Sequence, residues 1–179
     1  MGFKKKKCAW CKLMFEPHRP MQKVCAPKCA LAMAQKKREK IEMAETRRKL
    51  EALKPLRYFL KRTESACNEY IKLRDAHLPC ISCQRHHEGQ YHAGHYLSVG
   101  SHPELRFHPA NIHKQCQSCN THKHGNHHGY RQGLIEKIGL KEVEWLEGPH
   151  KAGKYTREEL DRIYALFKQK SKALRAGVR

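Results

Sequence analysis

Histidines are concentrated in one part of this chain of 179 residues. The segment YHAGHYLSVGSHPELRFHPANIHKQCQSCNTHKHGN, residues 91–126, holds seven of the fourteen histidines and has a Cys-x2-Cys pair near its end. An imidazole ring can ligate a metal, and a neutral ring can also accept a proton near pH 7. The segment therefore predicts either a zinc knuckle that only holds a fold together or a site that performs chemistry.

Eight of the nine cysteines fall in close pairs, which is the spacing typical of structural zinc sites. Four thiolates from two such pairs suit the tetrahedral preference of Zn²⁺ and leave no open coordination position. We predict two structural zinc sites, with the ligands Cys8, Cys11, Cys25 and Cys29 in the first and Cys80, Cys83, Cys116 and Cys119 in the second. The remaining Cys67 is expected to be a small buried apolar residue. Because sulfur satisfies both zinc ions, the histidines are free for another role.

The charge balance indicates a polyanionic partner. The chain has 37 Lys and Arg against 17 Asp and Glu, a formal net charge of +20. Residues 1–62 hold 19 basic and 5 acidic residues, so the first third is the expected electrostatic arm for DNA. Candidate DNA contacts are Lys4, Lys5, Lys6, Lys7, Lys36, Lys37, Arg38, Arg47, Arg48 and Lys123.

The cysteine usage and the hydropathy pattern predict a cytoplasmic protein. The opening MGFKKKK has no apolar segment typical of a signal peptide, and paired cysteines of this kind imply a reducing compartment. No run of about 18 apolar residues occurs, so no membrane span is expected.

Residues 30–53 consist largely of Ala, Lys, Arg, Glu and Leu and contain no Pro or Gly, so a helix is predicted there. Its apolar stripe is thin, which predicts an exposed basic linker; a solvated spacer and a DNA-tracking helix both fit. Pro55 ends this pattern. A second helix is predicted through residues 65–77, with Ala66, Tyr70, Leu73 and His77 on one face.

The remaining elements are short until the end of the chain. Strand-like pieces are expected around GQYHAGHY, and short helices in YRQGLIEKIGL and KEVEWLEG. Thr156-x2-Glu159 is a capping box that opens a last helix, whose apolar face is Leu160, Ile163, Tyr164 and Phe167.

The order of His95, Asn111 and Asn120 resembles the HNH, or ββα-metal, nuclease motif, in which two Cys-x2-Cys pairs often support the site. The resemblance implies that His95 is the general base that takes a proton from water, that Asn111 locks the imidazole ring or holds the turn, and that Asn120 stands at the final position. It also implies one divalent cation, Mg²⁺ or Mn²⁺, which needs few protein ligands. Such families commonly have Asp or His directly before the base, but this chain has Gly94. Candidate catalytic-metal ligands are therefore His92, His113, Asn120 and His122.

A closer resemblance rests on the strings RDAHLPCISC, AGHY, LRF, NIHKQC, CNTHKHGN and YRQGL. In this order and at about these intervals, they are similar to the NinG/Rap recombination proteins of lambda-like phages. The resemblance covers most of the chain and implies a structure-specific endonuclease for branched DNA, such as Holliday junctions and D-loops, in the cytoplasm of an infected bacterium. Host or phage recombination proteins are further expected partners. A four-way junction favours a homodimer, with the long helices as its interface.

The predicted fold class is α+β and mostly helical, with a zinc-stabilised ββα-metal nuclease core. The predicted segments are a four-cysteine zinc unit (1–29), a basic helical linker and helix (30–79), the HNH-like core with the second zinc site (80–128) and C-terminal helices (129–179). Two alternatives stay open. A non-catalytic zinc-finger DNA-binding protein would have the same charge and cysteines, and a homing or restriction enzyme would need a dedicated recognition helix.

Overall fold

A computed structural model describes residues 3–177, which divide into two units at Lys54 and Pro55. The mostly helical α+β class predicted from the sequence is confirmed, since the sheets are small and helices dominate. The four-part division of the chain stays a prediction. Within residues 3–177, none of the helices combines the length and the apolar character that crossing a membrane requires.

The first unit consists of a small hairpin followed by a long helix. Strand β1 (Lys6–Lys7) pairs antiparallel with β2 (Met14–Phe15), and helix α1 follows (Pro27–Ala52). Pro27 suits the first turn of a helix, because its missing N–H has no partner there. No residue of α1 is buried, which confirms the exposed basic helix predicted from the sequence.

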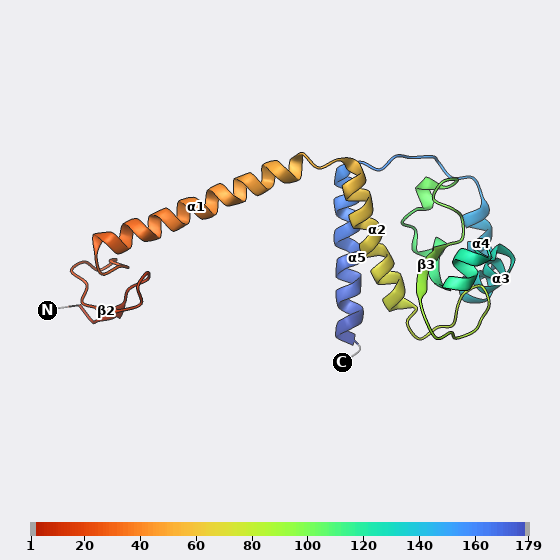
Figure 1. Ribbon diagram of the computed structural model, residues 1–179, viewed down its shortest axis with the longest axis horizontal. Helices are drawn as coiled ribbons and strands as arrows, with labels where there is room; N and C mark the ends of the chain where they lie inside the picture. The colour runs from red at the N-terminus through yellow and green to blue at the C-terminus, as the bar shows by residue number, and fades with distance from the viewer. Residues whose placement is uncertain (1–2, 178–179) are drawn as a thin grey trace. The chain divides into compact units, whose positions relative to one another are not determined.

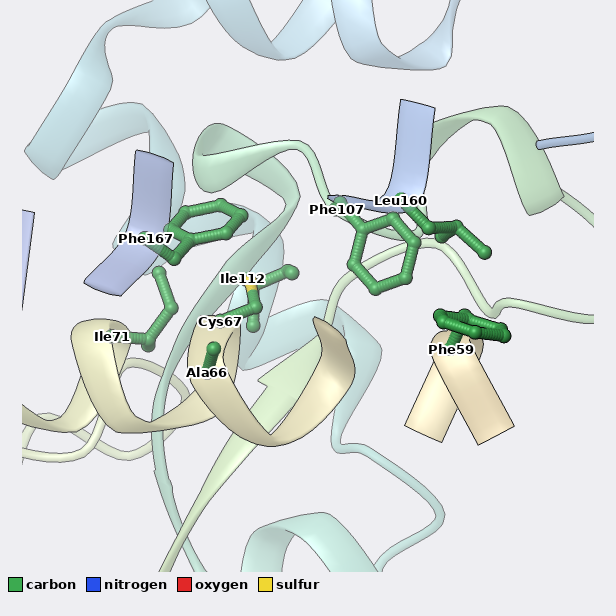
Figure 2. Close-up of a cluster of buried hydrophobic side chains, with 8 residues drawn as sticks. All are labelled: Phe59, Ala66, Cys67, Ile71, Phe107, Ile112, Leu160 and Phe167. Atoms are coloured by element: carbon green, nitrogen blue, oxygen red, sulfur yellow. The ribbon is translucent and has the colours of Figure 1, made fainter. Parts of the chain in front are cut away.

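The second unit is built around two long helices. Figure 1 shows α2 (Leu56–Arg74) and α5 (Arg157–Gly177) side by side. The capping box predicted for α5 is present: the Thr156 N–H donates to Glu159 Oε2 over 2.7 Å, and the Glu159 N–H donates to Thr156 Oγ1 over 3.2 Å. Both helices bury one apolar face in a shared cluster, drawn in Figure 2: Phe59, Ala66, Cys67, Ile71, Phe107, Ile112, Leu160 and Phe167.

Cys67 confirms its predicted place in this core, at 1 % exposure. Burial raises the pKa of its thiol to about 12. The start of the helix around it was predicted too late: α2 begins at Leu56, because Phe59 and Thr63 continue the buried face toward Pro55. The placement of His77 on this face is also wrong, since α2 ends at Arg74 and His77 is exposed.

A two-stranded hairpin forms the centre of the second unit. Strand β3 (Tyr91–His95) runs antiparallel to β4 (Ile112–Cys116), with Tyr91 opposite Cys116 and His95 opposite Ile112. Two 3-10 turns interrupt the connection, η1 (Pro103–Leu105) and η2 (Pro109–Asn111). The predicted strand in GQYHAGHY is therefore confirmed.

Three short helical elements follow the hairpin: the π-helical turn η3 (Ser118–His122), α3 (His127–Ile138) and α4 (Leu140–Glu147). They cover a second core of Ile81, Tyr96, Leu105, Tyr130, Leu134, Val143 and Leu146. Helix α3 comes very close to the loop before β3, because a Cβ atom at Gly129 or Gly133 would lie 2.1 or 2.0 Å from a carbonyl oxygen of that loop.

A buried carboxylate joins these elements. Asp75, 1 % exposed, accepts hydrogen bonds from the Arg74 guanidinium at 2.7 and 2.8 Å, from Lys137 of α3 at 2.7 Å and from the Lys114 N–H of β4 at 3.1 Å. Burial alone raises the pKa of the Asp75 carboxyl, but the hydrogen bonds from Arg74 and Lys137 outweigh it and lower this pKa to about 2. Asp75 is therefore ionised at neutral pH and fixes α2, β4 and α3 to one another.

We predict that Asp75→Asn lowers the free energy of unfolding by about 3 to 5 kcal/mol, because it leaves Arg74 and Lys137 without their shared counter-charge. The same change at Asp161, an exposed partner of Arg62, should cost less than about 1 kcal/mol. Urea unfolding at pH 7 with saturating zinc measures both. Equal effects of the two substitutions would show that Asp75 does not hold these elements together.

Candidate nuclease site and zinc centres

The first cysteine cluster lies within the N-terminal unit. Cys8 and Cys11 flank the turn between β1 and β2, whereas Cys25 precedes α1 and Cys29 lies in its first turn. The Sγ atoms of Cys11 and Cys25 are 3.6 Å apart, and those of Cys25 and Cys29 are 3.5 Å apart. Four sulfurs around one tetrahedral Zn²⁺ at 2.3 Å lie about 3.8 Å from one another, so the cluster has the size of a zinc site.

The second cluster joins two parts of the chain separated by 32 residues. Cys80 and Cys83 come from the loop after α2, Cys116 ends β4, and Cys119 lies in η3. The four Sγ atoms lie within 4.8 Å of one another. Backbone N–H groups point at the sulfurs, with the Cys116 N–H 3.3 Å from Cys80 Sγ. Such donors stabilise thiolates, the form that binds zinc.

Both four-cysteine sets predicted from the sequence are therefore brought together, and each could hold a zinc ion. Among the described residues, these two sets are also the only groups of three or more His, Cys, Asp or Glu side chains close enough to share one metal. A site for a second kind of metal must accordingly use fewer of these side chains, together with other donors.

His95 lies at the end of β3 that is remote from the cysteines. The second cluster adjoins Tyr91, opposite Cys116, and His95 is four residues further along the strand. At a rise of about 3.3 Å per residue, the cysteine cluster and His95 are roughly 13 Å apart along the strand. His95 therefore cannot share a metal with this cluster.

The imidazole of His95 is oriented by a backbone carbonyl. His95 Nε2 lies 3.0 Å from the carbonyl oxygen of Arg106, in the turn that follows η1. A carbonyl oxygen only accepts, so a neutral His95 must carry its proton on Nε2. This tautomer leaves the lone pair on Nδ1, and the ring is half-buried rather than enclosed. The neutral ring of His95 thus presents Nδ1 as its accepting atom, which is the arrangement that a general base requires.

Asn111 is buried and holds the loop after β3. Its Oδ1 accepts from the Leu97 N–H at 2.8 Å, and its Nδ2 donates to the carbonyl oxygens of Leu97 at 3.0 Å and Leu105 at 3.3 Å. Of the two roles expected for this residue, these bonds support holding the turn. Since Leu105 directly precedes Arg106, Asn111 also positions the carbonyl that orients His95.

Three of the four candidate metal ligands lie on the other face of the hairpin from His95. His92 and Gly94 of β3 are paired with Gln115 and His113 of β4, and side chains opposite one another in a ladder point to the same face. Asn120 of η3 reaches this face, because its Oδ1 lies 3.1 Å from the point where a Cβ atom would lie if residue 94 had a side chain. His122 is exposed at the end of η3.

Several polar atoms on this face have no hydrogen-bond partner within residues 3–177, namely His92 Nε2, His113 Nδ1 and Gln115 Oε1. His113 is 1 % exposed and its ring packs edge-on against Tyr130. Burial, together with the charges of Lys137 and Arg74, lowers the pKa of His113 to about 3. His113 is therefore neutral at physiological pH.

Gln115 was missed by the sequence analysis. The available signal was its place two residues after His113 in a strand, which puts both side chains on one face. The carbonyl of Arg106 was also missed, since a backbone group has no signature in the sequence.

The basic residues expected to contact DNA are largely exposed. Lys4, Lys5 and Lys7 lie in and before β1 and are exposed, whereas Lys6 is half-buried. The basic residues predicted on α1 are all exposed, and so is the one after η3: Lys36, Lys37, Arg38, Arg47, Arg48 and Lys123. Each can therefore reach a phosphate.

We expect two zinc ions per chain in the purified protein, and dialysis against Mg²⁺ should not displace them, because thiolates prefer zinc to hard cations. Replacing Cys116 with Ser should remove one zinc, whereas Cys67→Ala should retain both. Elemental analysis of the folded protein gives the count. One zinc or none in the wild-type protein would contradict the assignment of the clusters.

The comparisons with known proteins all indicate the same family. The model of the family described as "NinG: Bacteriophage Lambda NinG protein" matches residues 2–176. The chain is 42 % identical to Protein ninG of Salmonella phage P22, over 92 % of this chain and 90 % of that protein. It is 41 % identical to Protein ninG of Escherichia phage 933W, over 96 % and 94 %, and 41 % identical to Protein ninG of Escherichia phage lambda, over 92 % and 90 %. No solved structure matches the chain significantly. The chain belongs to the NinG family of phage proteins.

Proposed function

We propose that this protein is a divalent-metal-dependent endonuclease that cleaves phosphodiester bonds in branched DNA during phage recombination. The observation that carries the proposal is the hydrogen bond between His95 Nε2 and the Arg106 carbonyl, which leaves Nδ1 as the accepting atom. The ring lies about 13 Å along β3 from the thiolates, so base and structural zinc are separate.

In the proposed reaction, His95 Nδ1 accepts a proton from a water molecule as the water oxygen forms a bond to phosphorus. The bond between phosphorus and the leaving sugar oxygen then breaks. The Arg106 carbonyl keeps its hydrogen bond throughout, so it stabilises the imidazolium that forms and prevents the ring from turning. Asn111 acts as a positioning residue for this carbonyl.

A hard divalent cation, Mg²⁺ or Mn²⁺, fits the other face of the hairpin. Such an ion needs only one or two protein ligands, since water and phosphate complete its shell. His92 Nε2 lacks a hydrogen-bond partner within residues 3–177, and Asn120 Oδ1 lies 3.1 Å from where a Cβ atom on Gly94 would be. The ion would polarise the phosphate and stabilise the leaving oxygen.

The preference for branched DNA comes from the resemblance to the NinG/Rap recombination proteins. The exposed basic residues of α1 and of the N-terminal hairpin supply contacts to phosphates, which carry little base information. Such contacts suit an enzyme that selects a branch and not a base sequence. A homodimer would match the twofold symmetry of a four-way junction, and other recombination proteins of the phage or host are candidate partners.

A non-catalytic zinc-finger DNA-binding protein is the second candidate function. The net charge of +20 and the two cysteine clusters favour it equally. It assigns no role, however, to the orientation of His95 by Arg106. A homing or restriction enzyme is less well supported, since it would need a helix dedicated to base recognition.

The function is tested by cleavage of a four-way junction under single-turnover conditions with Mg²⁺. We expect His95→Ala to lower the cleavage rate by roughly 10²- to 10⁴-fold, the usual contribution of a general base, while zinc content and junction affinity stay unchanged. His77→Ala is the matched control, because His77 is exposed and lies outside the site. Wild-type activity in His95→Ala would remove His95 from the chemistry, and a wild-type protein that binds the junction without cutting it would favour the non-catalytic alternative.

The basic surface of α1 generates a separate prediction. Each phosphate contact contributes about 0.9 to the slope of log affinity against log salt concentration. Changing Lys36, Lys37, Arg38, Arg47 and Arg48 to Gln should therefore flatten this slope by up to about 4.5 and reduce the preference for a junction over linear duplex. Because no residue of α1 is buried, the helix should stay folded, which circular dichroism can verify. An unchanged slope would show that the helix does not contact DNA.

A further inference from the structure

Gly94 is surrounded by polar atoms that converge on the space its missing side chain would fill. A Cβ atom at this position would lie 2.2 Å from Gln115 Oε1 and 3.1 Å from Asn120 Oδ1. Two amide oxygens from different elements, β4 and η3, are thus directed at one buried point. The glycine does not serve an unusual backbone conformation here, because it lies within a regular strand. Its role is to leave room for the Gln115 amide, which a Cβ atom would displace.

The orientation of the Gln115 side chain follows from its donors. Gln115 is fully buried, and its Nε2 donates to Ser82 Oγ and to the Gly125 carbonyl oxygen, both at 2.6 Å. A flipped amide would place two oxygens against each other at the Gly125 carbonyl, so the flip is excluded. Oε1 therefore points toward Gly94, where it has no hydrogen-bond partner among the described residues.

A buried oxygen without a partner is destabilising, and Gln115 Oε1 is fixed in that state by its own amide donors. His92 is opposite Gln115 in the ladder and has an unpartnered Nε2 on the same face. Amide oxygens and an imidazole nitrogen can both ligate a divalent cation, and the predominance of oxygen favours a hard cation.

We propose that Gln115 is a ligand of the divalent cation, and that its Oε1, together with Asn120 Oδ1, holds the ion beside Gly94. Gln115 then supplies from β4 the oxygen that an acidic residue directly before the base would supply from β3. This assignment rests on the proposed function, which provides the reason for a hard cation beside Gly94, the residue that directly precedes His95.

The test measures Mn²⁺ binding to the zinc-loaded full-length protein by electron paramagnetic resonance, without DNA. Gln115→Met removes the oxygen and keeps the length of the side chain, whereas Gln115→Glu keeps an oxygen at Oε1. Both variants lose the amide group that donates to Ser82 and Gly125, so the loss of these two hydrogen bonds is common to them. We expect Met to weaken Mn²⁺ binding by roughly 10- to 100-fold and Glu to retain or strengthen it.

A second pair of variants tests the close approach of Gln115 to Gly94. In Gly94→Ala the new methyl group collides with Gln115 Oε1, so Mn²⁺ binding should be lost, while zinc content stays at the wild-type level. Gly100→Ala is the control, because its Cβ would meet nothing closer than Ser98 Oγ at 3.9 Å. Equal Mn²⁺ affinity in the wild type and in Gln115→Met would overturn the proposal. So would a wild-type protein that binds no Mn²⁺, in which case the oxygens hold a buried water only.

The experiments can distinguish a failure of the proposed cation site from a failure of the proposed nuclease activity. A protein that binds Mn²⁺ through Gln115 but leaves every branched DNA intact supports the cation site and rejects the nuclease. A protein that cuts a junction with Mg²⁺, and whose Gln115→Met variant binds Mn²⁺ as the wild type does, supports the nuclease and rejects Gln115 as a ligand.

Discussion

The cluster of Cys80, Cys83, Cys116 and Cys119 is the interaction on which the second unit depends. It joins the loop after α2 to the end of β4 and to η3, and so it closes a segment that has few apolar residues of its own. Zinc binding by such a cluster contributes directly to folding. With one end of the hairpin closed by sulfur, the other end is free to carry His95, so the cysteine cluster and His95 lie at opposite ends of a five-residue strand.

Asp75 connects the hairpin to the helices of the second unit. Its contacts with Lys114 and Lys137 attach the hairpin and α3 to the end of α2, while the apolar faces of α2 and α5 cover Ile112 on β4. The hairpin is consequently fixed both by the cysteine cluster and by a buried ionic network. This rigidity matters for the proposed chemistry, because the orientation of His95 depends on a carbonyl in a loop that Asn111 holds through the hydrogen bonds of its carboxamide.

The parts of this structure that could be predicted from sequence are those with local signals. Both cysteine clusters follow from pair spacing, and the start of α5 follows from Thr156 and Glu159. Asp75 and Gln115 could not be recognised, because their significance comes from partners far along the chain: Lys137 is 62 residues from Asp75, and Ser82 is 33 residues from Gln115. The prediction that the helix continues to His77 failed for a similar reason. The helical periodicity of the sequence continues past Asp75, whereas in the structure α2 ends at Arg74 and Asp75 turns inward to meet its partners.

We propose different roles for two metals: zinc on sulfur would hold the fold, and a hard cation beside Gly94, the residue before His95, would take part in cleavage. The most direct test is the cleavage rate of a four-way junction as Mg²⁺ is added to protein that already contains two zinc ions per chain. We expect no cleavage before the addition, a saturable rise in rate with Mg²⁺, and a zinc content that stays constant throughout. Full cleavage by the zinc-loaded protein without added Mg²⁺ would contradict this division between the two metals.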